Sequence, residues 1–186
     1  METNVRTLLA RFQEGYARRD QTYLDEFMEL FVPDDELEVI GTNAVEPGRE
    51  EWCRGREAVR ELVSGDWEYW GKVEYDVAGA RIHVRGDVAW MATTGTVTDT
   101  ITRDDRYVGY LDYVQGVLKE EETSQQAKML EIVRLGNDIV LALPLSETFV
   151  WPFRFTAVAV QQEGEWRFHQ MQFSFATTRS PDVRNE

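Results

Sequence analysis

Few side chains in this sequence of 186 residues have the types and spacing that catalysis or metal binding requires. The chain contains two histidines, His83 and His169, and one cysteine, Cys53. These residues match no metal-ligand motif, and Cys53 has no histidine nearby in the sequence to act as its base. The glycines show no phosphate-binding spacing. We therefore expect no bound metal and no cofactor, and we interpret Cys53 as a small, partly buried residue.

Arg154 has the most unusual surroundings of any charged residue, because the segment around it is otherwise almost wholly apolar. A guanidinium in such a segment needs an anionic or a carbonyl partner. The partner is either an internal carboxylate, with Asp99 and Glu147 as candidates, or the acid group of a bound ligand. Burial of such a carboxylate in a pocket would raise its pKa and suit it to act as a base.

Aromatic side chains make up 12% of the sequence and need an interior, a pocket or a partner surface to cover them. A curved sheet closed by helices leaves a cavity that such residues can line, although any one of them can equally be an ordinary core residue. The aromatic residues that we consider for a pocket are Tyr16, Trp52, Trp67, Trp90, Trp151 and Trp166.

The charge of the chain argues against two classes of partner. The formal net charge is −14 and no basic run occurs, which disfavours nucleic acids and anionic membrane surfaces. No apolar stretch approaches the roughly 18 residues of a membrane span, and residues 1–20 lack the apolar core of a signal peptide. A single cysteine allows no intrachain disulfide. We therefore expect a cytoplasmic protein.

The spacing of apolar residues changes along the chain, from helical in the first third to alternating from Val73 onward. Gly86-Asp87 and Glu163-Gly164 are the expected hairpin turns. The pattern predicts helices with apolar faces over residues 5–16, 24–31 and 59–67, a short strand near 36–42, a loop over 43–52, and strands within 73–101 and 147–177.

A segment from about residue 102 to 146 interrupts the strands. It is too long for a plain loop, and residues 107–118 and 129–135 have apolar residues at helical spacing. We expect a helical insertion of one or two helices there, ending at Gly136-Asn137. No linker or repeat divides the rest, so we expect a single domain over residues 1–186.

Several short motifs occur in this order along the chain: Phe31-Val32-Pro33-Asp34-Asp35, Gly55-Arg56-Glu57-Ala58-Val59, Asp87-Val88-Ala89-Trp90, Arg154-Phe155-Thr156 and Gly164-Glu165-Trp166-Arg167-Phe168. Together with the order of the elements, they resemble the SnoaL-like family of the nuclear transport factor 2-like superfamily. The resemblance implies an α+β fold in which a curved, mostly antiparallel sheet wraps around the N-terminal helices and forms a cone with a pocket. The residues expected to contact a ligand are Tyr16, Trp52, Trp67, Trp90, Arg154, Thr156, Gln170 and Gln172.

Two positions depart from the pattern of the superfamily. Many relatives carry His-x-His-x-Ser in the last strand, whereas this chain has Gln170 and Gln172, whose neutral amides cannot take up a proton near pH 7. The tyrosine that ketosteroid isomerases carry on the first helix corresponds to Phe12. We therefore expect neither histidine-dependent catalysis nor isomerase chemistry of that type.

The strand near residues 149–160 is apolar on both faces, with Val158 and Val160 on one and Phe153 and Phe155 on the other. An antiparallel strand with one face in water should alternate, so a second layer must cover this one. The resemblance also implies dimers that pack through the outer sheet face. We expect a homodimer, with the helix over residues 107–118 at the pocket rim or on the partner.

Three functions fit these observations. We favour a SnoaL-like domain that binds a small apolar or acid-bearing molecule of unknown identity. One alternative is an enzyme of the polyketide-cyclase, dehydratase or hydrolase type that uses a pocket carboxylate, and the other is a non-catalytic dimeric association module. A pocket carboxylate of shifted pKa would favour the enzyme, whereas a pocket filled by the chain's own side chains would favour the module.

Overall fold

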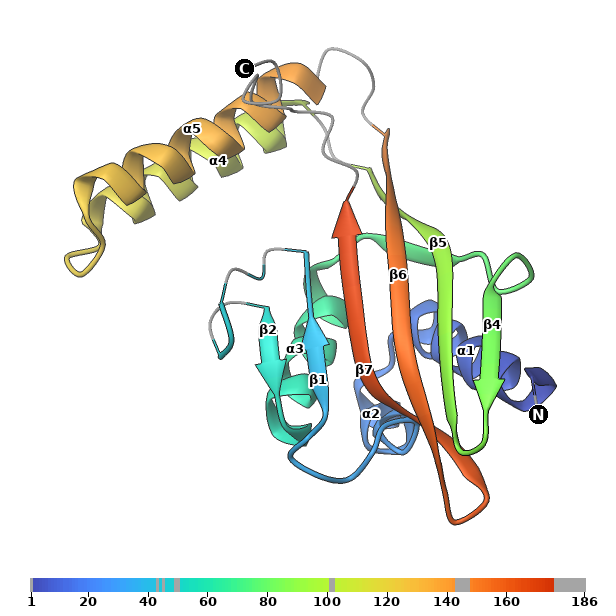
Figure 1. Cartoon of the computed structure of the whole chain (residues 1–186). Coiled ribbons are helices and arrows are strands. Elements are labelled where there is room, and N and C mark those ends of the chain that lie inside the picture. The colour runs from blue at the N-terminus through green and yellow to red at the C-terminus, as the bar shows by residue number, and fades with distance from the viewer. Residues whose placement is uncertain are drawn as a thin grey trace, which may run out of the picture. The chain divides into compact units, whose positions relative to one another are not determined.

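The computed structural model describes residues 2–42, 44, 46–48, 51–100, 103–142 and 148–175, and its elements are labelled in Figure 1. The chain forms two compact units. The first consists of Met1–Val97 and Trp151–Glu186, and the second of Thr98–Val150. The second unit is thus an insertion in the sequence of the first, at the place where the apolar spacing predicts one.

The first unit begins with the expected helices. Helix α1 spans Glu2–Arg18, and α3 spans Arg56–Tyr69. Between them, Asp20 caps the short 3₁₀ helix η1, Gln21–Tyr23, by accepting a hydrogen bond from the Thr22 backbone, and α2 follows as Leu24–Met28. This second helix ends before Phe31, which instead forms a parallel bridge with Phe168 of the sheet.

A mixed, mostly antiparallel sheet packs against these helices, which lie on one of its faces in Figure 1. Its strand order is β2-β1-β7-β6-β5-β3, with β4 paired to β5. β1 runs parallel to β7, whereas β1–β2, β4–β5 and β6–β7 are antiparallel pairs. The strands of the described residues are β1 Glu38–Ile40, β2 Trp52–Arg54, β3 Lys72–Tyr75, β4 Arg81–Arg85, β5 Val88–Thr100, β6 Thr148–Gln162 and β7 Glu165–Phe175.

The hairpin between β6 and β7 turns where the sequence predicts it. Glu163 and Gly164 have φ angles of 54° and 87°. Positive φ at both central residues is typical of the two-residue turns whose twist matches the flanking strands. The predicted loop over residues 43–52 was wrong at its end, because β2 begins at Trp52. A strand of three residues is too short to show an alternating pattern.

The core of the first unit is an aromatic cluster around Phe12 of α1. Its ring lies 5.0–6.1 Å, centroid to centroid, from six other aromatic rings. Alternation along β6 places Phe153 and Phe155 in this core, whereas Arg154 and Thr156 on the opposite face are exposed. The rings around Phe12 are Tyr16, Phe27, Phe31, Tyr75, Phe155 and Phe168.

The second unit contains the helices α4, Arg103–Lys119, and α5, Gln125–Ala142, which pack against each other. The Lys128 side chain is buried and donates to the carbonyls of Leu118, at 3.2 Å, and Glu120. The predicted end at Gly136-Asn137 was wrong, since α5 continues to Ala142. Gly136 serves the contact with α4 instead, because a Cβ there would lie 2.4 Å from the Tyr110 hydroxyl. Within the described residues, no helix is both long and apolar enough to cross a membrane.

Candidate functional site

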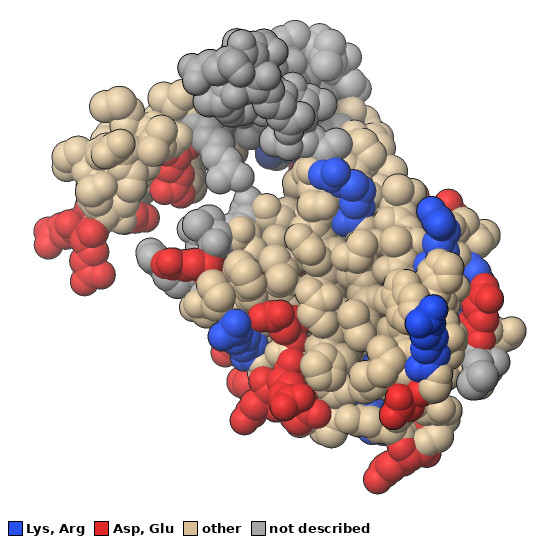
Figure 2. Space-filling model, viewed as in Figure 1, with Lys and Arg blue, Asp and Glu red and all other residues tan. Residues whose placement is uncertain are grey.

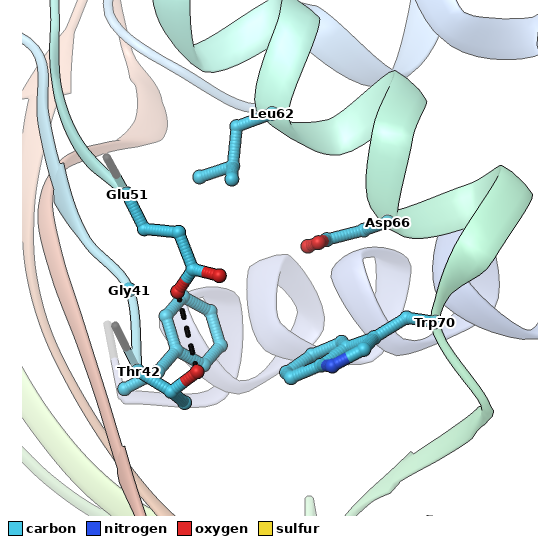
Figure 3. Close-up of a pocket in the computed structure, with 7 residues that line it drawn as sticks. Gly41, Thr42, Glu51, Leu62, Asp66 and Trp70 are labelled. Atoms are coloured by element: carbon cyan, nitrogen blue, oxygen red, sulfur yellow. Dashed lines mark hydrogen bonds between the residues drawn. The ribbon is translucent and has the colours of Figure 1, made fainter. Parts of the chain in front are cut away.

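A small cavity in the first unit is lined by Asp66, whose carboxyl has a strongly raised pKa. Its free volume is about 10 Å³, roughly the space of one water molecule. Three walls are apolar or aromatic, and two carboxylates face each other across the space in Figure 3. We call it the Glu51–Asp66 cavity; its described lining consists of Gly41, Thr42, Glu51, Leu62, Asp66, Trp70 and Phe173.

Helix α3 places Asp66 in the wall of this cavity. Leu62, Asp66 and Trp70 follow one another at intervals of four residues, so they lie on one side of α3 and its C-cap. The Tyr16 hydroxyl of α1 donates a hydrogen bond of 2.8 Å to Asp66 Oδ2. An acidic residue thus occupies a helix face that is otherwise apolar.

The surroundings of Asp66 raise its pKa to about 7 from an ordinary value of 3.8. The main cause is burial, which disfavours the charged carboxylate. The hydrogen bond from Tyr16 opposes this effect, the nearby charge of Glu51 adds to it, and the positive charge of Arg19 opposes it. At neutral pH this carboxyl therefore exists in both its protonated and its ionised forms.

Glu51, which directly precedes β2, is the second carboxylate that lines the cavity. The Thr42 hydroxyl donates to Glu51 Oε2 at 3.2 Å, and the Gly41 N–H donates to the Glu51 carbonyl at 2.9 Å. A Cβ at Gly41 would lie 2.4 Å from Glu51 Oε2, so the absence of a side chain at this position lets the carboxylate approach β1. The cavity thus combines two carboxylates of different environments.

Arg19 holds the end of α3 that carries Asp66. Its guanidinium donates to the backbone carbonyls of Asp66 at 3.1 Å, Trp67 at 2.8 Å and Gly71 at 3.1 Å, and also to that of Trp70. Carbonyls at the end of a helix lack intrahelical partners, and a cation is favoured beside them. Arg19 therefore satisfies the last turn of α3 from the neighbouring end of α1.

The arrangement is suited to proton transfer. A carboxyl whose pKa lies near the working pH acts as either a general acid or a general base. Tyr16 is a proton donor throughout the neutral range, because burial, followed by the charge of Asp66, raises its pKa well above the ordinary value. The lining offers no histidine or thiol as a nucleophile within its described part.

The eight residues predicted to contact a ligand do not come together at this cavity. Tyr16 contacts the cavity lining only through its hydrogen bond to Asp66. Trp67 is buried in the core, and its ring centroid lies 6.4 Å from that of Tyr16. Trp52 donates its indole N–H to Glu38 at 2.9 Å, and Trp90 is exposed.

The other four lie on strands β6 and β7. Thr156 pairs with Gln172, and both side chains are exposed on the face opposite the core, as is Arg154. Gln170 is half-buried and pairs with Val158. That these residues bind a ligand stays a prediction, and they share no surface with the cavity.

Within the described residues, Arg154 pairs with a backbone carbonyl and not with the internal carboxylate Asp99, while a ligand's acid group as its partner stays a prediction. Its guanidinium is exposed and donates to the Phe175 carbonyl at 2.7 Å. Asp99 instead accepts a hydrogen bond of 3.1 Å from Arg106 within the second unit, and Glu147 lies outside the described residues. Alternation of β6 places Arg154 on the outer face, so its apolar neighbours in sequence are not its neighbours in space.

Sequence reasoning overlooked Asp66 and Glu51. A signal for Asp66 was present, because an aspartate stands between Leu62 and Trp70 at helical spacing on a face that should be apolar. Glu51 carried no signal, since it lies in a stretch interpreted as loop. Burial of the Asp66 carboxyl depends on residues from α1, from the stretch that follows β1, and from β7, which no local pattern connects.

The histidines and the cysteine lie outside this cavity. His83 is exposed and stacks on Trp90 with ring centroids 5.5 Å apart, and His169 Nε2 lies 3.6 Å from Glu36 Oε2. Cys53 is half-buried, and its burial, followed by the charge of Glu51, raises the pKa of its thiol. Within the described part of the chain, no group of three or more His, Cys, Asp and Glu side chains is placed to hold a metal ion.

Comparison with known proteins adds a family and a fold. The model of the SnoaL-like domain matches residues 5–123. No curated protein matches the sequence.

Among solved structures, an NTF2-like superfamily protein from Salmonella enterica serovar Typhimurium aligns with a TM-score of 0.57 and 15% identity, covering 97% of this chain and 95% of that one. A protein from Streptomyces avermitilis, provisionally named a dehydratase of the NTF2-like family, aligns with a TM-score of 0.56 and 12% identity, covering 95% of this chain and 96% of that one. A third protein, from Thiobacillus denitrificans, is provisionally named a calcium/calmodulin-dependent protein kinase type II association domain. It aligns with a TM-score of 0.52 and 13% identity, covering 91% of this chain and 93% of that one. At these identities the likeness concerns the fold alone.

Proposed function

The chain belongs to the SnoaL-like domain family. We propose that it binds a small molecule at the Glu51–Asp66 cavity and that the Asp66 carboxyl takes a proton from that molecule or gives a proton to it. The observation that carries the proposal is the half-buried Asp66 carboxyl, whose pKa of about 7 lies where an acid–base catalyst works best. Perturbed carboxyls in a concave site are frequent in active sites, although structural networks also produce them.

The size of the cavity favours a reaction that adds or removes water. Ligand pockets usually enclose about 300 Å³ or more, whereas this cavity holds about one water molecule. The body of a ligand therefore lies outside the cavity, and only a hydroxyl-sized group enters it. In a dehydration, a base removes a proton from carbon and the hydroxyl leaves as water after it receives a proton. Asp66 is suited to both transfers, because it is present in both forms at neutral pH.

The test is a ligand screen by thermal shift, run in parallel on three proteins. Small hydroxylated and carbonyl compounds should raise the melting temperature of the wild type, and the same shifts should be lost in Asp66→Asn. Asp112→Asn is the matched control, because it makes the same change at an exposed position of α4. Compounds that stabilise Asp66→Asn as well as the wild type would show that the cavity does not bind them, and the proposal would fail.

A second candidate, the non-catalytic association module, is favoured by the same small volume, since the Glu51–Asp66 cavity has room for only about one water molecule. The outer face of the sheet provides a surface for association. Figure 2 shows this face with mostly uncharged residues at its centre and charged residues toward its margins. The exposed Trp90 and the half-buried Val158 belong to it.

We propose that this outer face joins two copies of the chain. Large, stable protein interfaces are depleted of charged residues at their centre and enriched in aromatic ones. The likeness to an association domain supports assembly as a use of this fold, without identifying the partner. A homodimer is compatible with either function, so the ligand screen decides between the candidates and the mass in solution decides the assembly.

A further inference from the structure

Arg19 occupies a backbone position that is unfavourable for an arginine. It follows α1 directly and has a φ of 50°, in the left-handed region. Its N–H donates to the Gly15 carbonyl at 2.8 Å, which closes the last turn of α1. Glycine is the usual residue at such a helix end, because any Cβ is strained there. A turn alone does not explain an arginine at this place.

The side chain of Arg19 supplies the explanation. Its guanidinium reaches the last turn of α3 and donates four hydrogen bonds to the carbonyls of Asp66, Trp67, Trp70 and Gly71. Two of these residues, Asp66 and Trp70, also line the Glu51–Asp66 cavity. The same fork of donors therefore fixes the backbone that carries both the Asp66 carboxyl and the Trp70 ring.

The electrostatics of a helix end make this cation important for Asp66. α3 ends at Tyr69, so Asp66 stands in its last turn, where the partial negative charge of the helix end disfavours a carboxylate. The groups that face Asp66 from neighbouring elements are the Tyr16 phenol, the Glu51 carboxylate and, through weaker charge interactions, Tyr75 and Cys53. Among these named groups none carries a positive charge, so Arg19 is the cation that offsets the helix end.

We propose that Arg19 is a positioning residue for the site: it holds the end of α3 in place and keeps Asp66 ionisable by offsetting the negative charge around it. This inference rests on the proposed role of Asp66 in proton transfer. It assigns to Arg19 an electrostatic role that a purely structural cap lacks. The direction of the Arg19 effect on the pKa of Asp66, which is to lower it, agrees with this role.

The experiment measures the pKa of Asp66 by carboxyl NMR in the wild type and in Arg19→Met, Arg19→Gly and Arg19→Lys. Removal of the charge in the Met and Gly variants should raise that pKa by about half a pH unit or more. Arg19→Lys keeps the charge without the planar fork, so the rise should be smaller. Arg19→Gly also relieves the positive φ, and its melting temperature should therefore fall less than that of Arg19→Met while the pKa rises equally.

The outcomes separate the two proposals. An Asp66 pKa near 7 in the wild type that does not move in Arg19→Gly would overturn the electrostatic role of Arg19 and leave the proposed function standing. An Asp66 in the wild type that titrates near its ordinary value would overturn the proposed function and this inference together. Should Arg19→Met fail to fold, the comparison of the Gly and Lys variants with the wild type gives the same decision.

Discussion

The Tyr16 hydroxyl donates a hydrogen bond of 2.8 Å to Asp66 Oδ2 and joins α1 to α3 across 50 positions of the sequence. The phenol lies in the aromatic core, whereas the carboxyl opens into the cavity. The bond therefore places a buried proton donor against a carboxyl that lines the cavity. Its removal should change the acidity of Asp66 without changing the packing around Phe12.

Tyr16→Phe should raise the pKa of Asp66 above its value of about 7, because the hydrogen bond stabilises the ionised carboxyl. A hydrogen bond to a charged group contributes about 1.5 kcal/mol, which corresponds to roughly one pH unit. Carboxyl NMR titration of the variant measures the change. Tyr23→Phe, at a half-buried tyrosine outside the cavity, is the control. A lower pKa in Tyr16→Phe would contradict the assigned direction.

The stability of the fold should depend on pH through Asp66. Its pKa is raised from 3.8 to about 7 on folding, so between these values the folded state binds more protons than the unfolded state. The Asp66 contribution to the free energy of unfolding is therefore present below about pH 4 and is lost as the pH rises to 7. Asp66→Asn has no carboxyl at this position, so its free energy of unfolding should not fall in this way between pH 4 and pH 7.

Urea denaturation of the wild type and Asp66→Asn at pH 5 and pH 8 measures this linkage. The variant should gain about 2 kcal/mol relative to the wild type between the two values, which is less than the full shift implies because the carboxyl is only half-buried. Asp112→Asn keeps Asp66, so its free energy of unfolding should change between the two pH values as that of the wild type does. Parallel pH profiles for the wild type and Asp66→Asn would show that Asp66 titrates alike in the folded and unfolded states.

Two helical glycines should respond in opposite directions to the same substitution. A Cβ at Gly15 of α1 would lie 2.2 Å from the Phe27 ring, whereas a Cβ at Gly65 of α3 would meet nothing within 4 Å. Gly65→Ala should stabilise the protein by about 0.5–1 kcal/mol through helix propensity. Gly15→Ala should destabilise it by about 1–3 kcal/mol, because the core around Phe27 must move. Thermal unfolding of both variants measures the contrast, and stabilisation by both would show that α1 and α2 pack less closely.

The homodimer proposal is tested by a charge on the outer sheet face. The wild type should sediment near twice its chain mass of 21.6 kDa. Val158→Asp should give a monomer or insoluble chain, because an interfacial carboxylate without a partner is costly to desolvate. Val133→Asp makes the same change at an exposed position of α5 and should keep the mass of the wild type. A monomeric wild type at micromolar concentration would refute the proposal.

The sequence by itself determined the order of the elements in the first unit and the places where the chain turns. Apolar spacing located α1 and α3, and the pair Glu163 and Gly164 identified the β6–β7 hairpin. These features arise from contacts between residues close in sequence, and such contacts leave a local pattern. The resemblance to SnoaL-like domains added the fold, which the family model and the solved structures bear out.

Among the described residues, the tertiary structure decided that the Asp66 carboxyl has a pKa of about 7. Asp99 and Glu147 were the predicted carboxylates. Asp99 pairs with Arg106 and Glu147 lies outside the described residues, whereas Asp66 meets Tyr16, Glu51 and the charge of Arg19. Its pKa depends on how much water reaches the carboxyl and on charges from distant parts of the chain. Arg154 shows the converse, because alternation of β6 places a guanidinium from an apolar segment in solvent. Burial is a property of the packed fold, and a one-dimensional pattern records it only where neighbours in sequence are also neighbours in space.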